Sequence, residues 1–175
     1  AKKYDIKYST TDYKKILNDD EVDTVIISTK HDTHSKLVIE SLNSHKNTFV
    51  EKPLALSYKE LKKIDTTINS LNNPMLSVGF NRRFSPHIQK LKSYLSDNKG
   101  PVNIVITINA GFIEDTHWVH DTELGGGRIL GEACHFIDLC VFLSGSVVKK
   151  VCMNSLGEKS NLNTDNASLL LQFEN

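Results

Sequence analysis

The stretch VDTVIISTKHDTHSKLVIESLNSHKNTFVEKP, residues 22–53, decides the fold that the sequence predicts. It opens with the β-branched run Val25–Ile27, which is typical of a strand buried on both faces of a parallel sheet. Residues 34–45 then place apolar side chains at helical spacing, and residues 47–51 form a second short apolar strand. A strand, a helix and a strand in this order predict a right-handed parallel βαβ unit.

The same alternation extends on both sides of this stretch. Asp32 or Thr33 can cap the helix of residues 34–45, and Ser57 with Glu60 forms a capping box for another helix. The further elements expected here are a strand over 5–10, a helix over 13–19 capped by Thr11 or Asp12, and a strand over 75–80. The first part of the chain is therefore predicted to be an α/β layer with a parallel sheet.

The order of elements changes after about Gly79. Ser85 and Pro86 favour a helix start, and one long apolar helix is expected later in the chain. The remaining elements expected are a strand over 101–113, a polar loop over 117–127, the apolar helix over 128–145, and strands over 147–156 and 167–174. Long strands around one helix predict an α+β domain with a largely antiparallel sheet.

The sequence contains no G-x-G-x-x-G turn near its start and stops directly after a predicted strand. We therefore expect a fragment of a longer protein. It would hold the C-terminal part of a Rossmann-like parallel sheet over 1–79 and an incomplete α+β domain over 80–175.

Composition excludes several classes of protein. Basic and acidic residues balance at 21 each in 175 residues, which gives no basic face for nucleic acid or for an anionic membrane. No apolar run approaches the roughly 18 residues of a membrane span. The three cysteines, Cys134, Cys140 and Cys152, are odd in number and lie in apolar segments. Such thiols indicate a reduced, cytoplasmic protein.

Polar side chains follow the predicted strands where ligands of open parallel sheets bind. Glu51 and Lys52 end one of these strands, and Pro53 restricts Lys52 to an extended backbone and allows a cis peptide bond. A lysine near a carboxylate and apolar walls can orient a hydroxyl or take part in proton transfer. The alternative is a solvated Glu-Lys pair before an exposed turn.

A second polar cluster lies in GGGRILGEACHFIDL, residues 125–139. On an α-helix Arg128, Glu132 and His135 fall within about 60° of arc, and Asp138 lies about 60° further round. A polar stripe on an apolar helix must face polar partners or a cavity. The alternatives are a hydrogen-bonded core histidine and a flexible glycine loop.

Other chemistries find little support. His117, His120, Glu132 and His135 could suggest zinc, but no H-E-x-x-H or C-x-x-C spacing accompanies them, so no metal is expected. No G-x-S-x-G motif is present, and no cysteine lies in an electropositive motif.

These pieces in order resemble the glucose-fructose oxidoreductase, inositol dehydrogenase and rhizopine catabolism family of nicotinamide-dependent oxidoreductases. The matching pieces are VDTVIISTKHDTHSKLVIESL (22–42), TFVEKPLALS (48–57), VGFNRRFSP (78–86) and GGGRILGEACHFID (125–138). The resemblance runs from about Asp12 to the end of the chain. It implies that residues 1–79 belong to a dinucleotide-binding domain and residues 80–175 to a substrate and oligomerisation domain.

The resemblance implies a cofactor, NAD or NADP, and the residues that border it. Glu51 and Pro53 would line the nicotinamide end of the cleft, with Glu51 near the ribose. Thr29 and His34 match the family's threonine and histidine after a strand and would border the dinucleotide.

The resemblance also implies a reaction, which is reversible hydride transfer between a sugar or cyclitol carbinol carbon and the nicotinamide. Lys52 and His135 would manage the proton, with Glu132 beside them. The side chains expected to bind the substrate are Arg82, Arg128 and Asp138. The family commonly forms dimers or tetramers, so a homo-oligomer is expected.

Two residues depart from the family pattern. Gly131 stands where the family places an aspartate, with Glu132 next to it, and Lys30 stands where many members have proline. These departures keep open an alternative function, that of a non-catalytic relative that senses a ligand or binds a regulator.

Overall fold

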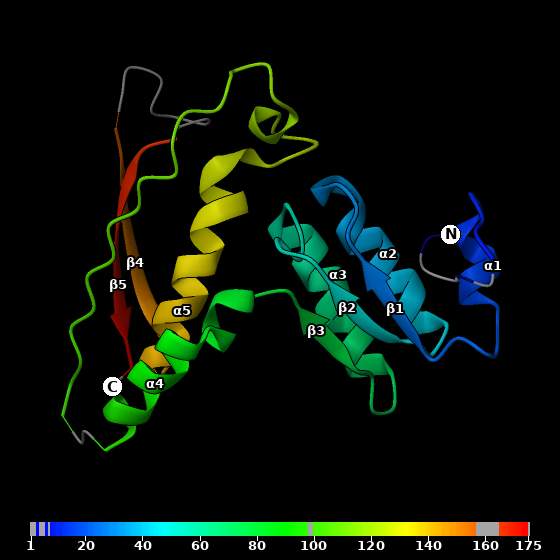
Figure 1. The fold of residues 1–175 in the computed structure, drawn as a ribbon, viewed down its shortest axis with the longest axis horizontal. Helices are drawn as coiled ribbons and strands as arrows, with labels where there is room; N and C mark the ends of the chain where they lie inside the picture. The colour runs from blue at the N-terminus through cyan, green and yellow to red at the C-terminus, as the bar shows by residue number, and fades with distance from the viewer. Residues whose placement is uncertain (1–2, 4–5, 7, 98–99, 157–164, 175) are drawn as a thin grey trace.

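The computed structural model describes residues 3, 6, 8–97, 100–156 and 165–174. Its first part is built on three parallel strands in the order β1 (Thr24–Ile27), β2 (Asn47–Val50) and β3 (Leu76–Val78). The helices α2 (His31–Asn43) and α3 (Tyr58–Ser70) connect the strands and pack together beside the sheet (Figure 1). This arrangement confirms the predicted parallel α/β layer.

Local sequence signals account for most helix starts. Asp12 caps α1 (Tyr13–Leu17), and Ser57 forms the predicted capping box with Glu60 at α3. Ser85 caps α4 (Pro86–Ser96), whose first residue is proline. The strands β1 and β2, the helices α2 and α3 and the segment after β2 build the core of the first part, formed by Ile27, Val38, Leu42, Val50, Ala55 and Ile64.

The start of α2 differs from the prediction. The helix begins at His31, so Lys30 occupies the N-cap position without a side-chain hydrogen bond, and Asp32 and Thr33 lie inside the first turn. The Asp32 N–H instead donates to the carbonyl of Leu124, at 3.2 Å. A tertiary contact thus replaces the local cap at this helix end.

The second part follows β3 through the short 3₁₀ helix η2 (Asn81–Phe84) and α4. A second 3₁₀ turn, η3 (Trp118–His120), precedes the π-helical turn η4 (Ile129–Ala133) and α5 (Cys134–Ser144). The strands β4 (Val148–Ser155) and β5 (Ala167–Phe173) form the predicted antiparallel pair, and α5 lies beside them (Figure 1). Gly145 ends α5 in the left-handed conformation, with φ of 68°.

Two predicted strands are not strands in the structure. Residues 101–113 run beside β5 as an irregular extended chain, although their apolar side chains partly alternate (Figure 1). Alternation describes which side chains are buried, but a strand also needs a hydrogen-bonded neighbour, and β4 and β5 pair with each other here. Of the strand predicted over 5–10, residues 5 and 7 lie outside the described residues, and residues 6 and 8–10 are irregular.

Candidate active site

The ammonium group of Lys52 joins the two parts of the molecule. Lys52 follows β2, and its peptide bond to Pro53 is cis, as the sequence allowed. Its Nζ donates to the carbonyl of Gly131 at 2.8 Å and to Oε1 of Glu132 at 3.1 Å, and the side chain is 16% exposed. An ammonium has three N–H donors, and the described residues accept two of them. The third N–H can therefore point to a ligand.

The π-helical turn η4 explains how Glu132 reaches this lysine. The sequence predicts a regular α-helix from residue 128, but residues Ile129–Ala133 form i→i+5 turns before α5 begins. The wider turn rotates these residues away from the face that α-helical spacing would give them. Gly131 and Glu132 consequently both contact Lys52. Arg128 does not share a face with Glu132, although α-helical spacing predicted that it would, and binds the Gly111 carbonyl instead.

His135 lies in the first turn of α5 with only 6% of its surface exposed. Its Nδ1 is buried and has no hydrogen-bond partner among the described residues. Burial lowers the pKa of His135, and the charges of Lys52 and Arg82 lower it further, against opposing effects of Glu132 and Glu51. The ring is therefore neutral near pH 7. An unpaired buried nitrogen is costly, so it marks a place where a ligand supplies the missing partner.

Glu51 lies against the end of β3. Its backbone N–H bonds to the carbonyl of Ile27 at 2.9 Å, and its Oε2 accepts a hydrogen bond from the N–H of Lys52 at 3.3 Å. A Cβ atom on Gly79 would stand 2.9 Å from that same Oε2. The absence of a side chain at Gly79 thus allows the Glu51 carboxylate to occupy the carboxyl end of the sheet.

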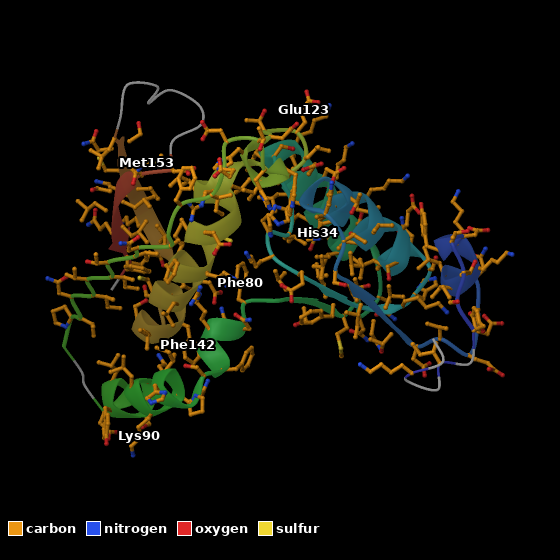
Figure 2. The ribbon with its side chains drawn as sticks, turned by 45° about the horizontal axis from the view of Figure 1, so that its top comes forward. His34, Phe80, Lys90, Glu123, Phe142 and Met153 are labelled. Atoms are coloured by element: carbon orange, nitrogen blue, oxygen red, sulfur yellow. The ribbon has the colours of Figure 1, made fainter. Side chains whose placement is uncertain are left out.

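Thr29 and His34 lie beside the residues that follow β1 and β2 and are linked by a hydrogen bond. His34 is fully buried inside the first part (Figure 2), where its Nδ1 lies 2.8 Å from the Pro53 carbonyl and its Nε2 lies 3.0 Å from the Thr29 carbonyl. It therefore links the residues after β1 to those after β2. The Thr29 hydroxyl shares a 2.5 Å hydrogen bond with Thr33.

Of the three residues predicted to bind a substrate, Arg82 lies nearest to the cluster. Its guanidinium stands 4.5 Å from the Phe136 ring centroid, and its charge reaches His135. Phe80, just before Arg82 in the chain, meets the His135 ring edge to face at 6.3 Å and lies between the two parts (Figure 2).

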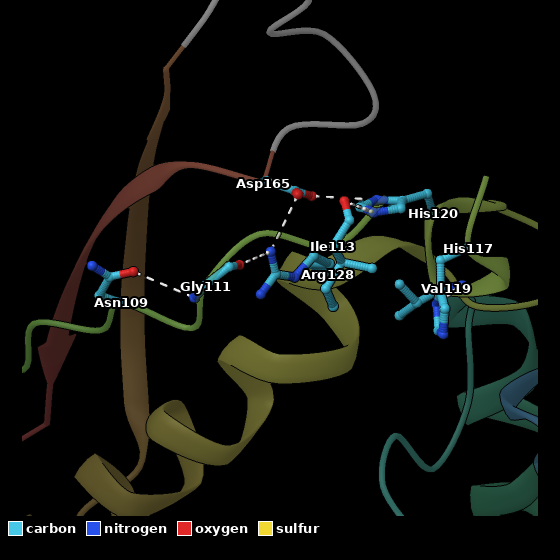
Figure 3. A network of polar contacts seen from close by, with 8 residues as sticks. All are labelled: Asn109, Gly111, Ile113, His117, Val119, His120, Arg128 and Asp165. Carbon is cyan, nitrogen blue, oxygen red and sulfur yellow. Dashed lines mark hydrogen bonds and ion pairs between the residues drawn. The ribbon is translucent and has the colours of Figure 1, made fainter. Parts of the chain in front are cut away.

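The other two predicted substrate residues have their charges neutralised elsewhere. The carboxylate of Asp138 is held by Arg83, whose Nε donates at 3.0 Å and whose Nη2 makes a second contact. Arg128 donates to the Gly111 carbonyl at 2.9 Å and pairs with Asp165 at 3.4 Å, in a network that also includes His120 (Figure 3). The structure therefore brings Arg82, but not the charged groups of Arg128 and Asp138, to the Lys52 cluster.

His31 is a residue of this region to which the sequence assigned no role. Its Nδ1 lies 2.8 Å from the Gly125 carbonyl, and its ring packs edge to face on Trp118 at 4.9 Å. Burial lowers its pKa, with Lys52 and His34 lowering it further against the Gly125 carbonyl and Glu132. The only signal in the sequence was its place in the polar run that follows β1.

The residues at the carboxyl ends of the three strands fit the reactive end of a nicotinamide dinucleotide. The Nδ1 of His135 has no partner among the described residues, the third N–H of Lys52 can bind a ligand, and the Glu51 carboxylate lies against Gly79 at this end of the sheet. Open parallel sheets bind nucleotides at this edge. Two other kinds of functional feature are absent from the described part of the chain. Within the described ranges no cluster of three metal-binding side chains is found, and no helix is long and apolar enough to span a membrane.

A parallel sheet with polar side chains at its carboxyl edge is the arrangement of the Rossmann-fold class of nucleotide-binding proteins. Residues 1–80 match the family described as "Oxidoreductase family, NAD-binding Rossmann fold". This match covers the first 80 of the 175 residues and supports the family resemblance that the sequence predicted.

Three relatives illustrate the likeness. An uncharacterized oxidoreductase of Bacillus subtilis, YrbE, is 27% identical over 182 residues, covering 100% of this chain and 52% of that protein. A levoglucosan dehydrogenase in complex with NADH and levoglucosan has a TM-score of 0.80 at 22% identity, covering 99% of this chain and 50% of its own. The myo-inositol dehydrogenase of Lactobacillus casei in complex with NAD(H) and myo-inositol has a TM-score of 0.76 at 21% identity, with coverages of 94% and 49%.

The two structural matches show a shared fold. The chain spans about half the length of each of these three relatives. Its activity, its substrate and its partners are consequently matters for proposal.

Proposed function

We propose that this chain carries the reactive end of an NAD- or NADP-dependent dehydrogenase acting on a secondary alcohol of a sugar or cyclitol. The observation that carries the proposal is the ammonium of Lys52, fixed by Gly131 and Glu132 next to the neutral and unpartnered His135. Relatives named for levoglucosan and myo-inositol support the substrate class.

Lys52 and His135 would have different roles toward the substrate. The third N–H of Lys52 donates a hydrogen bond to the carbinol oxygen, so the ammonium stabilises negative charge that develops there. His135 is neutral and can accept a proton from that hydroxyl or hold it through Nδ1. NAD or NADP, when bound, supplies the hydride acceptor at its nicotinamide.

The neighbouring groups keep this pair in place. Glu132 balances the charge of Lys52 at 3.1 Å, and the Gly131 carbonyl at 2.8 Å sets the direction of the side chain. The carboxylate of Glu51, with Pro53 following Lys52, would border the ribose of the cofactor, while Thr29 and His34 would border the dinucleotide. Arg82 beside His135 would contact the substrate, whereas Arg128 and Asp138, for which the sequence predicted the same role, are engaged by Asp165 and Arg83.

The division into residues 1–79 and 80–175, a cytoplasmic location and a homo-oligomer belong to the same proposal. Burial raises the pKa of the Cys134 and Cys140 thiols, that of Cys134 to about 11, so both stay protonated near pH 7. The odd number of cysteines, none of them paired among the described residues, supports the reducing compartment. Large apolar side chains on the strands β4 and β5 are exposed, among them Val151 and Leu170, which supports contact with another subunit.

Titration with NADH and NADPH tests the proposed function first. Calorimetry or nicotinamide fluorescence on the 175-residue chain and on the full-length polypeptide is expected to give binding in the micromolar range for the full-length protein. The cofactor that binds is then used with a panel of sugars and cyclitols. An absence of binding at millimolar cofactor by the full-length polypeptide would leave the sensing relative as the better account.

Acid is expected to destabilise the protein through His31 and His135, whose pKa values are lowered by burial. The folded-state pKa values of His31 and His135 lie below the usual value of about 6.5, so the unfolded chain binds more protons in the window below that pH. The free energy of unfolding therefore falls as the pH drops below about 6.5, by at most about 1.4 kcal/mol per pH unit for each histidine.

Urea unfolding between pH 7.5 and 5 measures this slope. His135→Gln is expected to flatten it, while His87→Gln, at an exposed position on α4, serves as the matched control and leaves it unchanged. An identical slope in wild type and His135→Gln would remove His135 as a source of the pH dependence.

A further inference from the structure

His31 lies close to both ends of the glycine-rich segment 125–131, whose last residue binds Lys52 through its carbonyl. At one end its Nδ1 lies 2.8 Å from the Gly125 carbonyl, and a carbonyl can only accept, so Nδ1 carries the proton of this hydrogen bond. At the other end its Cε1 would stand 3.4 Å from a Cβ placed on Gly131, so the ring lies close to that residue. The ring therefore spans the segment from residue 125 to residue 131.

The backbone of the same helix start reinforces this contact. The N–H of Asp32 donates to the Leu124 carbonyl at 3.2 Å, directly before the carbonyl that His31 binds. Two consecutive carbonyls of the loop are thus held by two consecutive residues of α2. Trp118 closes the other side of the His31 ring, with centroids 4.9 Å apart and planes at 74°. The ring is fixed by a hydrogen bond and by packing at once.

The segment held in this way carries the groups that orient Lys52. Gly131 supplies the carbonyl that accepts from Nζ at 2.8 Å, and Glu132 follows it with its carboxylate at 3.1 Å. Gly126 and Gly127 between the two ends have φ of 77° and 80°, a conformation that suits glycine and leaves the segment with little stiffness of its own. Several contacts hold it. The N–H groups of Gly125 and Gly126 donate to the Asp121 carbonyl at 2.8 and 2.9 Å, and His31 adds the contact that ties the segment to α2.

We propose that His31 is a positioning residue that holds residues 125–131 and thereby fixes the Gly131 carbonyl and Glu132 around the Lys52 ammonium. The activity arm of its test rests on the proposed function, whereas the contact itself does not. His31→Leu keeps most of the volume and removes the donor. His31→Asn keeps an N–H that can reach the Gly125 carbonyl.

The first readout is the modification rate of Lys52 by an amine-reactive reagent in the full-length polypeptide, measured by peptide mass spectrometry with the exposed Lys59 as internal reference. In His31→Leu the rate is expected to rise about fivefold, the factor that corresponds to losing one hydrogen bond of about 1 kcal/mol. His31→Asn is expected to return the rate to that of wild type. Ile64→Val, in the core under α3, is the control for a general loss of stability and leaves the rate unchanged.

The second readout is turnover of a sugar or cyclitol substrate. His31→Leu is expected to lower kcat about fivefold with the cofactor KM unchanged, and His31→Asn to restore it. A wild-type modification rate in His31→Leu, or an equal rise in Ile64→Val, overturns the positioning role. If Lys52 responds as expected while wild type turns over no sugar or cyclitol, the positioning role stands and the proposed function fails.

Discussion

Replacing Lys52 with alanine is expected to lower kcat for a sugar or cyclitol substrate by about 10²- to 10⁴-fold in the full-length polypeptide. The ammonium of Lys52 joins both parts of the molecule through Gly131 and Glu132. Alanine removes the hydrogen bond to the carbinol oxygen and leaves His135 without a partner in proton handling. NADH affinity, measured by titration, is expected to change far less than kcat.

Two further variants test whether the effect is specific to the ammonium of Lys52. Lys52→Arg retains the positive charge, but a guanidinium is not deprotonated in proteins and has a different donor geometry, so it is expected to rescue little activity. Lys59→Ala, on the exposed side of α3, is the matched control and keeps wild-type kinetics. Retention of more than about a tenth of the wild-type kcat in Lys52→Ala would exclude this lysine from the chemical step.

Removing the guanidinium of Arg83 is expected to cost about 3 kcal/mol in the free energy of unfolding. The Asp138 side chain is only 9% exposed, and both of its oxygens are held by Arg83. In Arg83→Ala the buried carboxylate keeps its charge without a partner. Urea denaturation at pH 7 measures the difference, since the midpoint falls while the slope stays that of a two-state transition.

The double substitution Arg83→Met with Asp138→Leu distinguishes this explanation from a loss of packing. It removes both charges and fills the same space with apolar atoms, so it is expected to recover most of the stability lost in Arg83→Ala. A double variant as unstable as the single one would show instead that the packing of Arg83 on Phe142, 5.4 Å from the ring centroid, dominates.

Much of the fold could be predicted from local signals. The β-branched run Val25–Ile27 and the capping box of Ser57 act over a few residues, so the parallel sheet and the start of α3 follow from the sequence. The place of Lys52 at the carboxyl end of β2 follows in the same way, because strand ends of a parallel sheet share one edge. The expectation that the run Val25–Ile27 is buried on both faces was wrong, because Ile26 is 71% exposed while Ile27 is buried.

The parts that could not be predicted depend on distant contacts. The wider turn Ile129–Ala133 has no local marker, and α-helical spacing placed Arg128 and Glu132 on one face that the structure divides. His31 binds a carbonyl 94 residues further along the chain, a pairing that no pattern in its neighbourhood indicates. The region 101–113 has the alternation of a strand, yet strand formation depends on a neighbour and not on the segment itself.

The partners of Lys52 lie 79 and 80 residues after it in the chain. During synthesis the parallel sheet can be complete while the ammonium is still surrounded by water, because Gly131 and Glu132 have yet to emerge. A hinge movement that separates the two parts of the finished protein would return Lys52 to the same unrestrained condition. The modification rate of the Lys52 amine consequently reports whether the two parts are in contact with each other.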